Sequence, residues 1–182
     1  MALTPSGGTT RPILSTQLMS NSPEFDSLNS VKYLFLRHLS EPRDNSLRLV
    51  VEEAVVNRLV PASLPGDNPE LDEILKRSWP IESVQGCKTF ELAWSRYAAY
   101  LVTEELIGSC GSYDDEVYTG KLLRVYTKSH FLDYLARDTG GHVEPLQHYK
   151  LVCLNHLIDI GSYAPPDIRM IGASSGVPLR IQ

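Results

Sequence analysis

Two runs rich in aliphatic, β-branched and aromatic residues decide the fold: Val31-Lys-Tyr-Leu-Phe-Leu-Arg-His-Leu39 and Leu47-Arg-Leu-Val-Val-Glu-Glu-Ala-Val-Val56. Such runs favour extended strands that are buried on at least one face. The connection between them, Ser40-Glu-Pro-Arg-Asp-Asn-Ser46, is polar and holds typical turn residues. The sequence therefore predicts a β-hairpin over residues 31–56.

The segment over residues 89–103 fits two periodicities. Phe90, Leu92 and Trp94 alternate as they would in a strand, whereas Phe90, Trp94, Tyr97 and Leu101 also match the spacing of one helical face. The alternation is the cleaner pattern at the start of the segment, and aromatic residues favour strands. We interpret residues 89–103 as a strand, with a helix as the alternative.

The rest of the chain adds further strands and short helices. A helix is predicted from Pro69 to about Lys76, and a second one, capped by Ser129, ends near Asp138 with Gly140 as its stop signal. Strands are predicted over residues 122–126, 149–160 and 168–171, the second of these as one nearly continuous buried strand. The predicted fold class is α+β, a mainly antiparallel β-sheet with two or three short helices.

The chain has 182 residues, which is the size of one domain. Its first residues are rich in serine, threonine, proline and glycine and contain only one basic residue, Arg11. We predict a flexible N-terminal tail over residues 1–30 and a single α+β domain over residues 31–182.

Cysteine usage and the absence of targeting patterns indicate the compartment. The three cysteines are odd in number and lack the C-x-x-C spacing, which favours free thiols in a reducing environment. No signal-peptide pattern and no run of 18 apolar residues is found. We expect a cytoplasmic protein that does not bind membranes.

The acidic charge is concentrated in one segment. The 17 basic and 22 acidic side chains give a net charge of −5, and residues 97–120 hold five acidic residues and no lysine or arginine. The rest of the chain therefore sums to zero. Because basic residues form no cluster, a nucleic-acid binder is disfavoured.

A cysteine nucleophile is one candidate for catalysis. Cys110 lies in the small-residue loop Gly108-Ser-Cys-Gly-Ser112, and five histidines are available as a base. The neighbouring acidic residues oppose this reading, since negative charge raises the pKa of a thiol. A small hydrolase or transferase that uses Cys110 with a histidine stays the alternative function.

Two other motifs favour structural readings. Asp138-Thr139-Gly140 copies the short motif of aspartic proteases, but it occurs once and follows a helical pattern, so a helix end explains it. His142, His148 and His156 invite a metal site, yet on one continuous strand His148 and His156 lie too far apart to share an ion. We expect no metal site, no cofactor and no catalytic residue.

Part of the chain resembles a known group of proteins. The segments Phe90-Glu-Leu-Ala-Trp94 and Gly120-Lys-Leu-Leu-Arg-Val-Tyr-Thr-Lys-Ser-His-Phe-Leu-Asp-Tyr134, with His148-Tyr149 and Asn155-His156, are similar to small uncharacterised bacterial proteins. The resemblance covers about residues 90–171. It implies a bacterial cytoplasmic protein and brings no activity with it.

The acidic segment also holds four of the nine tyrosines. Tyrosine provides contact area at a low entropic cost, and carboxylates attract and orient a basic partner. We therefore expect a non-enzymatic interaction protein that binds a basic protein partner, for example an immunity protein that neutralises a toxin. The oligomeric state stays open. The predicted partner-binding residues are Glu104, Glu105, Tyr113, Asp114, Asp115, Glu116 and Tyr118.

Overall fold

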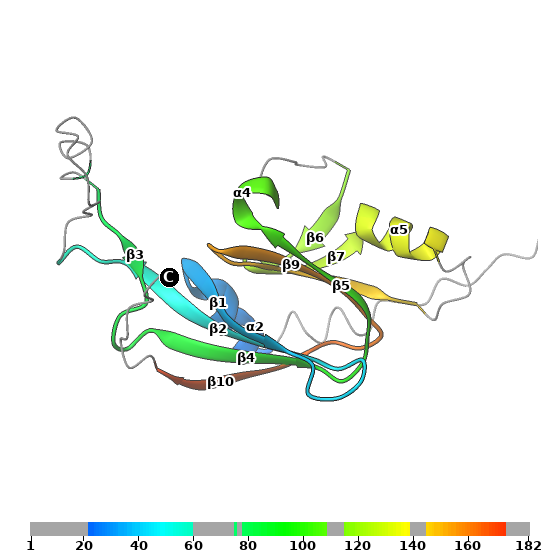
Figure 1. The fold of residues 1–182 in the computed structure, drawn as a ribbon, viewed down its shortest axis with the longest axis horizontal. Coiled ribbons are helices and arrows are strands. Elements are labelled where there is room, and N and C mark those ends of the chain that lie inside the picture. Colours follow the sequence, from blue (N-terminus) through cyan, green and yellow to red (C-terminus); the bar gives the residue numbers. More distant parts are fainter. Residues whose placement is uncertain (1–21, 60–74, 76–77, 109–114, 139–144, 174–182) are drawn as a thin grey trace, which may run out of the picture.

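The computed structural model describes residues 22–59, 75, 78–108, 115–138 and 145–173. Within these residues, two antiparallel β-sheets lie face to face, and the short helices α2, α4 and α5 pack around them (Figure 1). This arrangement confirms the predicted α+β class with a mainly antiparallel sheet. The strands divide into two sheets, which the sequence reading did not separate.

The first sheet has the strand order β1-β2-β4-β10, and the short strand β3 pairs with the end of β2. The predicted hairpin is confirmed, because β1 and β2 pair antiparallel around a polar turn. The bounds are β1 (Tyr33–Ser40), β2 (Leu47–Val56), β3 (Ile81–Glu82), β4 (Lys88–Trp94) and β10 (Asp167–Ala173).

The second sheet has the order β5-β9-β8-β7-β6, and every neighbouring pair is antiparallel. The predicted strand at residues 122–126 corresponds to β7. The bounds are β5 (Tyr97–Glu104), β6 (Val117–Thr119), β7 (Leu123–Lys128), β8 (Gln147–Val152) and β9 (His156–Ser162).

The hydrophobic core fills the space between the two sheets. The alternating residues Phe90, Leu92 and Trp94 of β4 are fully buried there, as the period of two requires. Tyr149 of β8 meets them from the second sheet, with its ring 5.9 Å from that of Trp94. The alternation that predicted a strand is therefore also the signal of the core face.

The strand predicted over residues 89–103 is present, but it is broken. The chain leaves the first sheet after Trp94 and enters the second at Tyr97, so β4 and β5 lie in different layers. The helical alternative is wrong. Residues 89–103 also match a helical spacing because they combine two strands with different surroundings. Phe90 of β4 is buried, whereas Leu101 lies on the edge strand β5 and is half exposed.

The single strand predicted over residues 149–160 is wrong. The chain turns back between Val152 and His156, and β8 and β9 pair as a hairpin. Their apolar run is nearly continuous because both strands lie inside the sheet. The turn is held by Asn155, whose side-chain amide accepts from Leu36 N–H at 2.9 Å and donates to Leu36 C=O at 3.0 Å. That contact comes from β1, 119 residues away in the sequence.

Residues 23–30, which the sequence reading placed in the flexible tail, form helix α2 (Pro23–Ser30). Ser22 caps the helix by accepting from Phe25 N–H at 3.1 Å, and Phe25 and Leu28 are buried. The helix contacts β7 and β10 and so closes one side of the space between the sheets. The predicted tail boundary is therefore wrong for residues 23–30, and residues 1–21 lie outside the described part of the chain.

The remaining helices lie over the second sheet, on the side away from the first (Figure 1). Helix α4 (Glu105–Gly108) continues from β5, and α5 (His130–Asp138) follows β7. Ser129 caps α5 as predicted, by accepting from Leu132 N–H at 3.2 Å, and the helix ends at Asp138. Gly140 and most of the helix predicted over residues 69–76 lie outside the described residues.

Candidate functional site

The site forms on the outer face of the second sheet. Along β8, Tyr149 and Leu151 point into the core, so Lys150 between them and His148 before them point outward. Strand pairing places Lys150 beside Arg124 of β7 on one side and beside Asp159 of β9 on the other. A row of charged side chains thus crosses the middle of this face.

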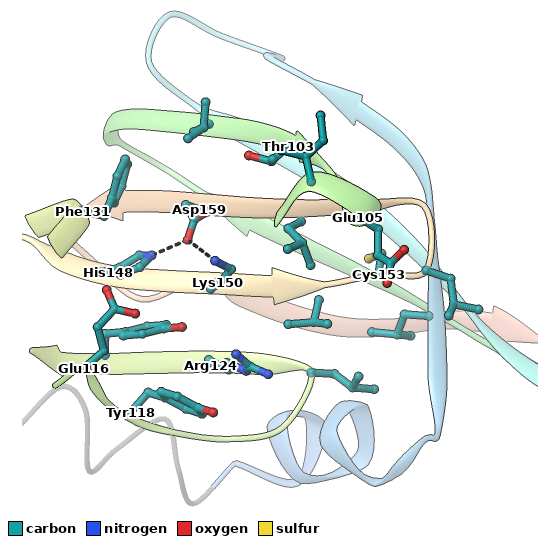
Figure 2. A pocket seen from close by; sticks show the side chains of 18 of the residues that line it. Thr103, Glu105, Glu116, Tyr118, Arg124, Phe131, His148, Lys150, Cys153 and Asp159 are labelled. Carbon is teal, nitrogen blue, oxygen red and sulfur yellow. Dashed lines mark hydrogen bonds and ion pairs between the residues drawn. The ribbon is translucent and has the colours of Figure 1, made fainter. Parts of the chain in front are cut away.

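A groove of about 1,030 Å³ lies over this row. Helix α4 contributes Glu105 and Ile107 to its wall, and the start of α5 contributes His130 and Phe131. Figure 2 shows Glu116 and Tyr118 near one edge strand of the sheet and Thr103 near the other, with the charged row between them. A volume of this size accommodates a small molecule or several side chains of a partner protein.

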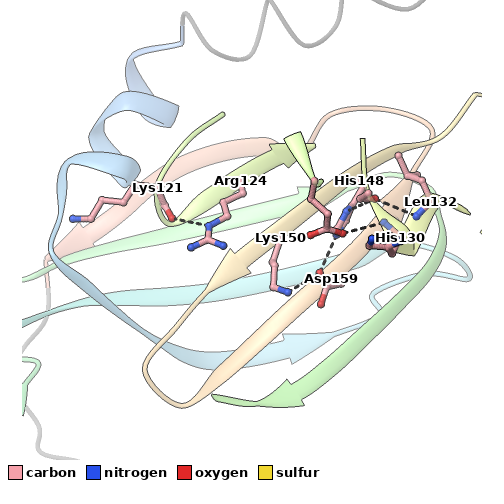
Figure 3. A network of polar contacts seen from close by, with 9 residues as sticks. Lys121, Arg124, His130, Leu132, His148, Lys150 and Asp159 are labelled. Atoms are coloured by element: carbon pink, nitrogen blue, oxygen red, sulfur yellow. Dashed lines mark hydrogen bonds and ion pairs between the residues drawn. The ribbon is translucent and has the colours of Figure 1, made fainter. Parts of the chain in front are cut away.

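His148 is the centre of a buried polar network at one end of the groove (Figure 3). Its Nδ1 lies 2.9 Å from Ser129 Oγ, and its Nε2 lies 2.9 Å from Asp159 Oδ1. Asp159 Oδ1 also pairs with Lys150 Nζ at 3.3 Å. The His148 ring stacks on Tyr126 with centroids 4.2 Å apart and is only 2% exposed.

The order serine, histidine, aspartate is that of a nucleophilic triad, but the surroundings favour a structural role. Ser129 is 2% exposed, and its Oγ already accepts the capping hydrogen bond from Leu132 N–H. A nucleophile has to reach its substrate, and a fully buried hydroxyl does not. The network instead ties the start of α5 to β8 and β9. Gly161 of β9 helps, because a Cβ there would lie 2.6 Å from Leu135 Cδ1 of α5.

The structure brings three of the seven predicted partner-binding residues to the groove. Glu105, Glu116 and Tyr118 line the groove, although Glu105 lies more than ten positions before the other two in the sequence. Glu104 is exposed and pairs in the sheet with His156, and it does not line the groove. Tyr113 and Asp114 lie outside the described residues, so their part of the prediction stays open.

Asp115 and Glu116, which precede β6, form ion pairs and hydrogen bonds with residues next to or at the start of α5. Asp115 pairs with Lys128 at 3.0 Å and with His130 at 2.9 Å, and hydrogen bonds to these two groups lower its pKa to about 2. Glu116 Oε1 accepts from His130 N–H at 2.9 Å. Glu105 has no ion pair within the described residues, so its charge is the least compensated of the three.

Sequence reasoning missed Arg124, Lys150, His148 and Asp159 as neighbours. A signal was present, since Arg124 and Tyr126, and likewise His148 and Lys150, alternate with core residues. It was not used because residues 149–160 were interpreted as a single strand, which hides the pairing of Lys150 with Asp159. Without the pairing of β8 with β9, the sequence does not show that these four side chains are neighbours.

Neither described cysteine has the surroundings of a nucleophile. Cys87 and Cys153 are 4% and 2% exposed, and burial raises the pKa of both thiols. A thiol held in its neutral form reacts slowly. Cys110 lies outside the described residues, and the alternative function built on it stays a prediction.

We expect Cys87 and Cys153 to resist alkylation in the folded protein. At pH 8, iodoacetamide should modify each at least about 100-fold more slowly than in 6 M guanidinium, because burial suppresses both access and thiolate formation. Mass spectrometry of tryptic peptides after timed quenching measures the two rates. Modification of Cys153 at the denatured rate would contradict the expectation.

Within the described ranges, no group of three His, Cys, Asp or Glu side chains is placed to hold a metal ion. His148 and His156 lie on neighbouring strands, opposite Gly161 and Glu104 respectively. The argument that one continuous strand keeps them apart is wrong, since they lie on two strands. His142 is outside the described part of the chain.

Among the described residues, no helix combines the length and apolar character needed to cross a lipid bilayer. No family model, no curated protein and no solved structure matches the chain.

Proposed function

We propose that this protein is a non-enzymatic binding protein that docks a basic protein partner at the groove on the outer face of the second sheet. The observation that carries the proposal is that Glu105 and Glu116, two carboxylates of the acidic segment, line one groove from opposite edges of the second sheet. Carboxylates in this position attract a cationic side chain and orient it. An immunity protein that neutralises a basic toxin is one protein of this kind.

Exposed apolar side chains support a macromolecular partner. Leu101, Ile107 and Tyr118 line the groove and are 52%, 67% and 43% exposed, and Leu106 beside them is 70% exposed. Leu101, Leu106 and Ile107 lie together on β5 and α4, and Tyr118 lies on β6 at the other edge of the sheet. Exposed apolar residues with polar neighbours are typical of protein interaction sites. Burying them supplies affinity, whereas the carboxylates set orientation and the rate of encounter.

The polar network at His148 favours binding over catalysis. Ser129, His148 and Asp159 are engaged with one another and almost fully buried, so they support the floor of the groove. A rigid floor reduces the ordering cost on binding.

Photo-crosslinking in the native host identifies the partner. A photoreactive phenylalanine at position 118, in the groove, should capture a basic protein, whereas the same group at the exposed Tyr134, which does not line the groove, should not. Capture of an acidic protein at position 118, or equal capture at both positions, would overturn the proposal.

Association kinetics of the captured partner then test the role of charge. At 50 mM salt, the double variant Glu105→Gln with Glu116→Gln should associate about 3- to 10-fold more slowly, and the difference should shrink at 300 mM salt. Glu24→Gln is the matched control, since Glu24 is exposed on α2 and does not line the groove. An unchanged association rate in the double variant would contradict the proposal.

A further inference from the structure

The charged row on the groove floor is not balanced. Arg124 and Lys150 lie directly opposite each other on β7 and β8, and Asp159 is the one carboxylate in the row. Asp159 is already engaged by Lys150 at 3.3 Å and by His148 at 2.9 Å. Like charges at paired positions destabilise a sheet unless a counter-charge is supplied.

Arg124 lacks such a counter-charge. Within the described residues no carboxylate pairs with it, and its Nε makes a long 3.4 Å hydrogen bond to Lys121 C=O. The other carboxylates of the groove form no ion pair with it among the described residues. Glu116 accepts from His130 N–H, and Glu105 follows β5, which lies three strands away from β7 in the sheet. Among the described residues, the guanidinium therefore has the Tyr126 hydroxyl as a side-chain hydrogen-bond partner but no carboxylate, and it lies inside a groove.

The position of Arg124 is suited to recognition. Its Cζ lies 4.6 Å from the centroid of the Tyr118 ring, which holds the guanidinium over an aromatic face. Figure 2 shows Arg124 between Tyr118 and Lys150. A guanidinium stacked in this way presents its in-plane N–H groups to a carboxylate or a phosphate.

We infer that Arg124 anchors an oxyanion group, a carboxylate or a phosphate, on a ligand whose apolar part lies against Tyr118 and Leu157 in the groove. The inference goes beyond the proposed function, because it assigns an anionic group to whatever enters the groove. A docking segment of a basic partner would then carry an acidic group beside its basic one. Lys150 adds positive charge on the same side of the anion.

Small aromatic probes test this inference directly. We expect benzoate and phenyl phosphate to bind the full-length protein with millimolar dissociation constants, measured by ¹H–¹⁵N chemical-shift titration. The shifts should centre on β7 and β8 around Arg124 and Lys150. Benzamide, the neutral isostere of benzoate, should bind at least 10-fold more weakly. The tighter of the two anions identifies whether carboxylate or phosphate is the preferred group.

Variants of Arg124 decide the outcome. Arg124→Gln should weaken both anions at least 10-fold, and Arg124→Lys, which keeps the charge and loses the planar fork, should weaken them about 3-fold. The matched control is Arg169→Gln, since Arg169 is exposed on β10 in the other sheet and pairs with Asp167. The melting temperature of Arg124→Gln should stay within about 3 °C of the wild type, because the loss of the ring contact and the relief of repulsion oppose each other.

Anion binding that survives unchanged in Arg124→Gln, or shifts that map away from β7 and β8, would overturn the inference. The lysine variant keeps the test valid if the glutamine variant does not fold. The probes are neither basic nor proteins, so failure here leaves the basic-partner proposal standing. Conversely, a basic partner that binds Arg124→Gln as tightly as the wild type would not contradict anion binding at Arg124.

Discussion

Asn29→Ala is expected to lower the free energy of unfolding by about 3 kcal/mol, because a single side-chain oxygen accepts from three backbone N–H groups. Asn29 Oδ1 accepts from the N–H groups of Lys121, Leu122 and Leu123 at 2.8, 2.8 and 3.1 Å. Leu122 and Leu123 are buried, so water cannot replace the lost acceptor for them. Urea unfolding followed by circular dichroism measures the loss.

Asn29→Asp is the matched variant for this test. The carboxylate keeps the acceptor oxygen, loses the hydrogen bond from Asn29 Nδ2 to Phe25 C=O, and places a negative charge near the end of α2. We expect it to cost about 1 kcal/mol. Equal losses in the alanine and aspartate variants would show that the acceptor oxygen is not what joins α2 to β7.

A second large effect is expected for Asp159→Ala. The substitution leaves His148 Nε2 and Lys150 Nζ without their shared acceptor at a site where Asp159 is 8% exposed. Removing one partner of a buried charged pair typically costs about 3 kcal/mol or more. Because the network also holds Ser129, hydrogen exchange should show the largest loss of protection in α5.

Two comparisons make the Asp159 result specific. Asp159→Asn keeps an acceptor for His148 and should lose roughly half as much stability. Asp167→Ala removes an exposed ion pair with Arg169 and should change stability by less than about 0.5 kcal/mol. If Asp159→Ala lowers the free energy of unfolding by less than about 1 kcal/mol, or leaves the hydrogen-exchange protection of α5 unchanged, the network does not fix the groove floor.

These two sites show why part of the structure escaped prediction. Residues 23–30 resemble a polar tail, since only Phe25 and Leu28 of α2 are buried. What makes them a stable helix is the docking of Asn29 onto residues 121–123, more than 90 positions along the chain. Local propensity contains no information about such a contact.

Only part of the candidate site could be predicted from the sequence, because some of its contacts also join distant segments. Charge counting singled out the segment that holds Glu105, Glu116 and Tyr118, and these residues do line the groove. The cationic side of the groove was missed, because Arg124 and Lys150 belong to segments that read as ordinary strands. Whether the groove binds a basic partner stays a proposal, to be decided by the crosslinking experiment.

Elements with local signals could be predicted from the amino-acid sequence. The hairpin of β1 and β2 follows from two apolar runs around a polar turn, and α5 follows from a serine cap and an amphipathic stretch. Tertiary structure alone decided that the chain changes sheets between Trp94 and Tyr97, and that Asn155 turns β8 back into β9 against Leu36. It also decided that Arg124, Lys150 and Asp159 form one row. The physical reason is that cross-strand neighbours are set by register between segments that burial brings together, and register is a property of the pair rather than of either strand.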